Sequence, residues 1–70
     1  MTNSTIEILR KNIKRYRLEA NFTQEKLSEL TGISSDYLSE IERGKKTPSL
    51  KRLIIIAEVL EVDIYKFFIE

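Results

Sequence analysis

The sequence contains no cysteine, no histidine and no tryptophan. Without cysteine, disulfides and thiolate metal sites are excluded. Without histidine, the chain lacks the commonest general base and the commonest zinc ligand, so catalysis would depend on carboxylates and lysines alone. We therefore expect no catalytic residue, no metal site and no cofactor, and no small-molecule ligand is evident from the residues.

Long hydrophobic runs are also missing. The longest, LIIIA from Leu53 to Ala57, is far too short to span a bilayer. The N-terminal stretch MTNSTIEILRKN has no apolar core of the length that a signal peptide needs. A chain of 70 residues is expected to form one domain, residues 1–70, in the cytoplasm and without a membrane partner.

The charges are unevenly distributed although the net charge is only +1. Residues 1–20 carry five basic groups against two acids, and residues 43–52 carry five basic groups and no acid. Residues 21–42 and 53–70 are predominantly acidic. Two basic segments could therefore attract a polyanion, although ordinary solvated surface charge explains the same pattern.

Helix-breaking residues are few: Gly32, Gly44 and Pro48 are the strongest, and Asn21 is weaker. Asparagine tolerates the left-handed conformation that ends helices, so Asn21 is expected to end the first one. The pieces between these helix-breaking residues have apolar residues at steps of three and four, which predicts helices rather than strands. The expected helices run from about residue 5 to 20, from 23 to 32, from 34 to 44, from 48 to 60 and from 64 to 68. The fold class is thus predicted to be all-α, a compact bundle of five helices.

The segment from Thr23 to Arg43 predicts two short helices joined by a tight turn, which is the helix-turn-helix geometry. Thr23 is a suitable N-cap for the first helix, in which Leu27 and Leu30 are expected to point inward, and Ser34 or Ser35 is a suitable N-cap for the second. Ser28 provides the small residue needed where the helices cross, and Gly32 can adopt the positive φ of the turn. The apolar positions that lock the two helices together are then Ile33, Leu38 and Ile41.

With these positions in place, the chain resembles the Cro and phage-repressor type of helix-turn-helix transcriptional regulators, including small phage repressors and restriction–modification controller proteins. The resemblance rests on IKRYRLEANFTQEKLSELTGIS, SDYLSEIERGKKTPSL and LIIIAEVLEVDI, and it covers about residues 8–68. It implies a single DNA-binding domain of the phage-repressor type with its motif at residues 23–43. Asn21, Ser28 and Thr31 depart from the usual residues of the family without threatening the fold.

The resemblance also implies a structural ion pair between Arg17 and Glu42, which would tie the first helix to the motif. Glu42 would then face the interior and not a DNA phosphate. The alternative is that both charges are exposed on separate faces.

The second motif helix would present its N-terminal part to the major groove, as such helices do. Its exposed face, which we call the reading face, consists of Ser35, Asp36, Ser39 and Glu40. Base edges do not require positive charge, because a carboxylate can accept a hydrogen bond from the cytosine N4 amine. Asp36 has an equally good alternative role, because a negative charge in the first turn stabilises a helix.

Contacts to the DNA backbone are expected on both sides of the reading face. Free N–H groups at the helix N-termini can face an anion, and exposed cations can face phosphates. Arg10 and Lys14 are weaker candidates, for which solvated helix charges are an equal alternative. The expected backbone contacts are Thr23, Gln24, Ser34, Tyr37, Arg43, Lys45 and Lys46.

The C-terminal third contains more apolar residues than one small domain can cover, which suggests a two-fold dimer interface. The alternative is that the last helix folds back and buries most of them within one chain. The residues expected at the interface are Ile55, Val59, Ile64, Tyr65 and Phe68.

The function predicted from the sequence is a sequence-specific regulator of transcription, a repressor or an activator. It would bind a palindromic double-stranded DNA operator as a homodimer and act by operator occupancy. The alternative is a protein-interaction module, such as the antitoxin of a toxin–antitoxin pair. An enzyme is disfavoured, because no pocket is expected around the two acids of the reading face.

Overall fold

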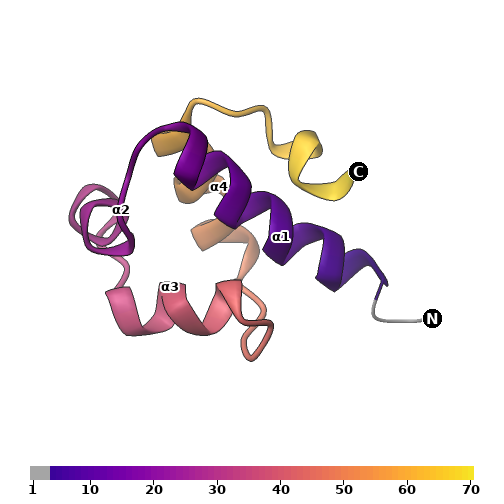
Figure 1. Ribbon diagram of the computed structural model, residues 1–70, viewed down its shortest axis with the longest axis horizontal. Coiled ribbons are helices and arrows are strands. Elements are labelled where there is room, and N and C mark those ends of the chain that lie inside the picture. The colour runs from indigo at the N-terminus through magenta and orange to yellow at the C-terminus, as the bar shows by residue number, and fades with distance from the viewer. Residues whose placement is uncertain (1–3) are drawn as a thin grey trace.

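The computed structural model describes residues 4–70, which contain four α-helices, a final 3₁₀ helix and no strand. The α-helices are α1 (Ser4–Glu19), α2 (Gln24–Thr31), α3 (Ser35–Glu42) and α4 (Leu50–Leu60), and the 3₁₀ helix is η1 (Ile64–Phe68). The predicted all-α class is confirmed. The expected fifth helix exists only as the five-residue 3₁₀ helix. Figure 1 shows α1 lying across the molecule, with η1 beside it and α3 along the opposite edge.

Three helices begin directly after a hydroxyl residue, as was expected at Thr23 and Ser34. The side chains of Thr23, Ser34 and Ser49 each accept a hydrogen bond from the backbone N–H three residues later. Each cap satisfies one of the donors that a first helical turn leaves without an intrahelical partner. These caps fix where α2, α3 and α4 start.

Residues with positive φ lie at or just after the ends of all four α-helices, including Gly44 after α3. Asn21 follows α1 with a φ of 62°, and Gly32 ends α2 with a φ of 76°. Both conformations were expected, since asparagine and glycine tolerate this region. Glu61 ends α4 with a φ of 57°, which the sequence did not indicate, because a glutamate rarely occupies that conformation.

The core draws on every element. Phe67 of η1 is fully buried, and its ring packs against Tyr16 of α1 with the centroids 5.9 Å apart. Leu30 was expected to be buried, but 45% of it is exposed, and within α2 only Leu27 is fully buried in the core. The buried apolar residues are Leu9, Ile13, Leu27, Ile33, Leu38, Ile41, Leu53, Ile56, Ala57, Leu60 and Phe67.

A buried amide joins the C-terminal segment to α1. Asn12 is 6% exposed, and its Nδ2 donates to the carbonyl oxygens of Phe67 and Ile69 at 2.9 and 2.8 Å. The two carbonyls lie where η1 ends and have no helical partner, so the amide completes their hydrogen bonding. This contact holds η1 against α1 in the position seen in Figure 1.

Candidate nucleic-acid interface

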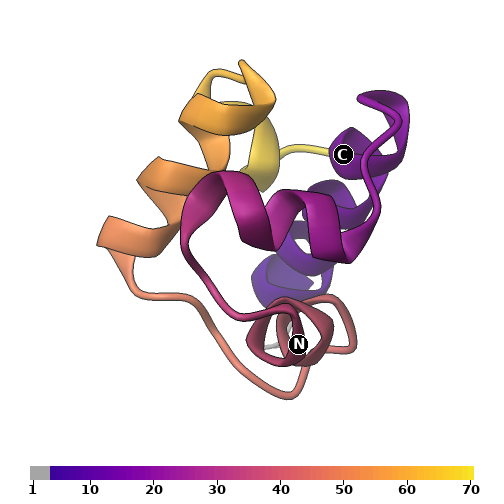
Figure 2. The same ribbon diagram turned by 90° about the vertical axis from the view of Figure 1, so that its left-hand side faces the viewer.

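The two motif helices are joined by the tight turn that the spacing predicted. Gly32 adopts the positive φ, and the Ile33 side chain that follows is buried. Leu38 and Ile41 of α3 are fully buried together with Leu27 of α2. These contacts fix the angle between α2 and α3, which Figure 2 shows with α2 crossing the view and α3 nearly end-on.

A buried ion pair ties α1 to the end of α3. The guanidinium of Arg17 donates from Nε and Nη2 to the two carboxylate oxygens of Glu42, at 2.7 and 3.0 Å. The two side chains are only 8% and 3% exposed. Arg17 also donates from Nη1 to the carbonyl oxygen of Phe22. Glu42 is therefore a structural acid inside the domain, as the resemblance implied, and it does not face outward.

The same carboxylate accepts a third hydrogen bond, from Nε2 of Gln24 at 3.0 Å. The sequence suggested that Gln24 contacts the DNA backbone, and the structure shows that its amide nitrogen already has a partner inside the protein. The hydrogen bond fixes the orientation of this side chain at the start of α2.

The reading face lies at an edge of the molecule. In Figures 1 and 2, α3 forms the lower edge and no other helix passes beyond it. Asp36 is exposed, whereas Ser35, Ser39 and Glu40 are half-buried. Within residues 4–70, none of these four side chains has a hydrogen-bond or ion-pair partner. Their polar atoms thus remain available to an external partner.

The segment after α3, residues 43–49, is called the basic loop here. Its backbone folds onto the end of α3, where the N–H groups of Lys45 and Lys46 both donate to the carbonyl oxygen of Glu40. The side chains of Arg43, Lys45 and Lys46 are exposed, and among the described residues no acid lies within ion-pair distance of them. Three cations are therefore displayed at the same edge as the reading face.

Tyr37 is half-buried between α3 and the start of α4. Its hydroxyl lies 3.5 Å from the carbonyl oxygen of Thr47, and the Arg52 guanidinium lies 5.0 Å from its ring centroid. A cation at this distance from a ring interacts favourably with it. These contacts hold Tyr37 and Arg52 near the N-terminal end of α3, and sequence reasoning had not identified Arg52.

The predicted backbone contacts at the two helix starts have dual roles. The hydroxyls of Thr23 and Ser34 are occupied as N-caps, accepting from the N–H groups of Lys26 and Tyr37. The remaining backbone donors of each first turn lie beside these caps. A DNA phosphate could reach those N–H groups, so contact through the backbone at these positions stays a prediction.

The residues expected at a dimer interface lie together on α4 and η1. Tyr65 and Phe68 are 57% and 41% exposed, whereas Ile55, Val59 and Ile64 are half-buried. Val59 and Ile64 pack against the core, so the alternative of burial within one chain holds for part of this set. The C-terminal segment nevertheless leaves large apolar side chains uncovered.

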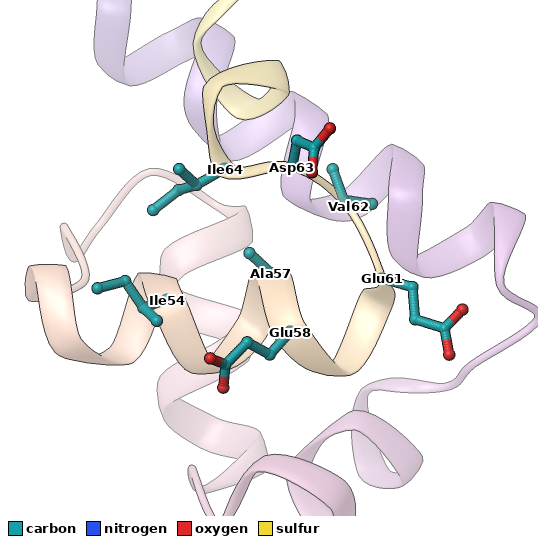
Figure 3. A pocket seen from close by; sticks show the side chains of 7 residues that line it. All are labelled: Ile54, Ala57, Glu58, Glu61, Val62, Asp63 and Ile64. Atoms are coloured by element: carbon teal, nitrogen blue, oxygen red, sulfur yellow. The ribbon is translucent and has the colours of Figure 1, made fainter.

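An open groove of about 430 Å³ continues this apolar surface between α4 and the segment that follows it. In Figure 3, Ile64 points toward Ile54 and Ala57, and the acidic residues lie along the margin. The groove contains no group suited to catalysis beyond solvated carboxylates. Its lining residues are Ile54, Ala57, Glu58, Glu61, Val62, Asp63 and Ile64.

Within residues 4–70, no cluster of carboxylates has the arrangement to hold a metal ion. No helix in the same range is long and apolar enough to cross a membrane.

Solved structures of other proteins superimpose on almost the whole chain. The restriction–modification controller protein C.AhdI from Aeromonas hydrophila superimposes with a TM-score of 0.85 and 24% identity, covering 90% of this chain and 96% of that chain. At this identity the likeness shows the fold alone. A transcriptional regulator of the HTH_3 family from Vibrio cholerae gives a TM-score of 0.87 at 28% identity, covering 97% of this chain and 38% of that one.

Comparison of the sequence gives the family. Control protein C.SmaI of Serratia marcescens is 37% identical over 60 residues, which cover 86% of this chain and 71% of that protein. An immunity repressor protein of Bacillus phage phi105 is 38% identical over 52 residues, which cover 74% of this chain and 36% of the repressor. The helix-turn-helix model HTH_3 matches residues 13–67. The chain therefore belongs to the HTH_3 family of helix-turn-helix transcriptional regulators.

Proposed function

We propose that this chain regulates transcription by binding specific double-stranded DNA, with α3 in the major groove. The observation that carries the proposal is the edge position of α3, whose reading face has no partner in the described residues and is followed by three unpaired cations. A major groove is about 12 Å wide, which admits one α-helix. Operator occupancy then regulates transcription.

Affinity and selectivity come from different residues in this proposal. Arg43, Lys45 and Lys46 attract the phosphate backbone, where most of the binding free energy arises. Asp36 and Glu40 accept hydrogen bonds from base amines such as cytosine N4. A carboxylate near phosphates is repelled unless it finds such a donor, so the acids also discriminate against sites that lack one.

The exposed side chains of Tyr65 and Phe68 support a homodimer formed through α4 and η1. A two-fold dimer places the two copies of α3 in successive major grooves, about 34–36 Å apart along the duplex. The operator of such a dimer is palindromic. Ile55, Val59 and Ile64 extend the same surface and would be partly covered by the second copy.

Selection of bound duplexes from a random pool tests the proposed function. The proposal expects an inverted repeat whose half-sites are one helical turn apart. A mobility-shift titration of the selected duplex should then show a steep loss of affinity with salt. If no sequence is enriched and no shift is seen, while the chain purifies with a second protein, the protein-interaction alternative replaces this proposal.

Two matched substitutions distinguish a contact between the basic loop and DNA phosphates from the general effect of removing one positive charge. Lys45→Gln should weaken binding to every sequence and lower the magnitude of the salt slope by about 1. Lys26→Gln is the control, because Lys26 is an exposed lysine of α2 that pairs with Glu29 at 3.4 Å. Equal effects of the two substitutions would mean that the basic loop has no special role.

A further inference from the structure

A second arginine of α1 reaches the end of α3 beside the ion pair described above. The Nη1 group of Arg10 donates to the carbonyl oxygen of Glu42 at 3.1 Å. Glu42 is the last residue of α3, so this carbonyl has no partner within the helix. Arg10 thus caps the helix at the point where the basic loop begins.

Glu7 holds Arg10 in this position. Its Oε1 accepts from Nε and Nη2 of Arg10, at 3.0 and 2.6 Å. The two bonds use one edge of the guanidinium and leave Nη1 directed at α3. The hydrogen bond from Arg10 also lowers the pKa of the Glu7 carboxyl below its usual value, so the pair is ionised at neutral pH.

The basic loop packs directly against the Arg10 side chain. Gly44 has a φ of +81°, and a Cβ placed there would lie 2.9 Å from Cδ and 3.1 Å from Nε of Arg10. A side chain at this position would force Arg10 to shift, and the positive φ also favours glycine. Arg10 therefore contacts the loop backbone between Arg43 and Lys45, two of the three exposed cations.

We propose that Arg10, held by Glu7, is a positioning residue that sets the path of the basic loop for DNA binding and does not itself touch DNA. This inference rests on the proposed function. Most of the Arg10 donors are already engaged within the protein, whereas Arg43, Lys45 and Lys46 are not. The Arg10–Glu7 pair thus affects DNA binding only through the position of the basic loop.

The substitution Glu7→Gln should change the DNA affinity in opposite directions, depending on whether Arg10 positions the basic loop or contacts DNA directly. If Arg10 positions the loop, the variant binds the selected duplex about three- to fivefold more weakly, the change expected for loss of a partly exposed ion pair. If Arg10 instead contacts phosphate, removing Glu7 frees it and binding becomes tighter. Glu19→Gln is the matched control, because it breaks the exposed Arg15–Glu19 pair on the same helix.

A double-mutant cycle supplies the second readout. Arg10→Gln should weaken binding in the natural chain and have little further effect when Arg43, Lys45 and Lys46 are all changed to Gln, because the supported cations are then gone. A loss that persists in this triple-Gln background would show direct contact and overturn the proposal. Circular dichroism at the assay temperature shows whether each variant is folded, so that only folded proteins are compared. If Arg10 had a purely structural role, its replacement would lower the thermal stability but leave the DNA affinity of the folded molecules unchanged.

The outcomes distinguish this proposal from the proposed function. A natural chain that binds no selected duplex overturns both. A natural chain that binds, but whose affinity is unchanged or tightened by Glu7→Gln, overturns the positioning role alone.

Discussion

Replacing Glu42 with alanine tests whether the fold depends on the ion pair between α1 and α3. The substitution removes the acceptor of two hydrogen bonds from Arg17 and of one from Gln24. Arg17 keeps only its bond to the Phe22 carbonyl and remains buried, with 8% of its side chain exposed. A buried guanidinium without its carboxylate is costly, because little water can replace the lost partner.

The expected cost is about 3–5 kcal/mol, the range for breaking one side of a buried pair. A domain of 70 residues has a total free energy of unfolding of about 3.5–10 kcal/mol. Glu42→Ala should therefore remove a large part of the free energy of unfolding at 25 °C. The double variant Arg17→Met, Glu42→Leu should be much less destabilised, since apolar residues of similar size often replace a buried pair at no net cost.

Urea unfolding followed by circular dichroism at 222 nm measures both effects. The single variant should unfold at far lower urea than the natural chain, and the double variant should recover most of that loss. A cost below about 1 kcal/mol for Glu42→Ala would match an exposed pair and refute the buried arrangement. A double variant less stable than the single one would refute the reasoning about the uncompensated charge.

Three further substitutions test other parts of the account. Glu61→Gly should raise the melting temperature by about 4–8 °C, because glycine relieves roughly 1 kcal/mol of left-handed strain at a φ of 57°. Phe67→Ala should cost about 3–5 kcal/mol in urea unfolding, because a fully buried ring is removed from the contact of η1 with α1. Arg10→Gln should raise the pKa of Glu7 toward its ordinary value, as measured by the carboxyl chemical shift in a pH titration. The lowered pKa means that Glu7 stabilises the natural chain above about pH 4.3 and that this contribution is lost as the pH falls through the folded-state value. The first prediction is contradicted if Glu61→Gly leaves the melting temperature unchanged. The second is contradicted if Phe67→Ala costs less than about 1 kcal/mol in urea unfolding, and the third if Arg10→Gln leaves the Glu7 titration unchanged.

The features predicted correctly from the sequence are those set by neighbouring residues. Thr23 and Ser34 fixed the starts of α2 and α3, because a hydroxyl N-cap needs only the N–H three residues later. Gly32 and Asn21 indicated left-handed ends for the same local reason. The ion pair of Arg17 with Glu42 joins residues far apart in the chain, and it was expected only because the sequence resembles a known family.

The features that were missed depend on contacts distant in the sequence. Leu30 follows the helical spacing of a core residue, but spacing along one helix does not show which side of that helix its neighbours cover, and 45% of Leu30 is exposed. Glu61 carries no sign in the sequence of the left-handed conformation with which it ends α4. Asn12 could have been noticed, because it is a polar residue between Leu9 and Ile13 on the buried side of α1. The partners of Arg10 could not be chosen from the sequence, since its long side chain can reach several neighbours.

The most direct test of the central claim is a ¹⁵N-labelled NMR titration of the chain with its selected duplex. We expect the largest amide shift changes in the first turns of α3, around Ser35 to Ser39, and in the basic loop. Smaller changes at α4 and η1 would accompany dimer formation. Amides of α3 that do not move while the duplex binds elsewhere on the surface would contradict the assignment of α3 as the helix that reads the major groove.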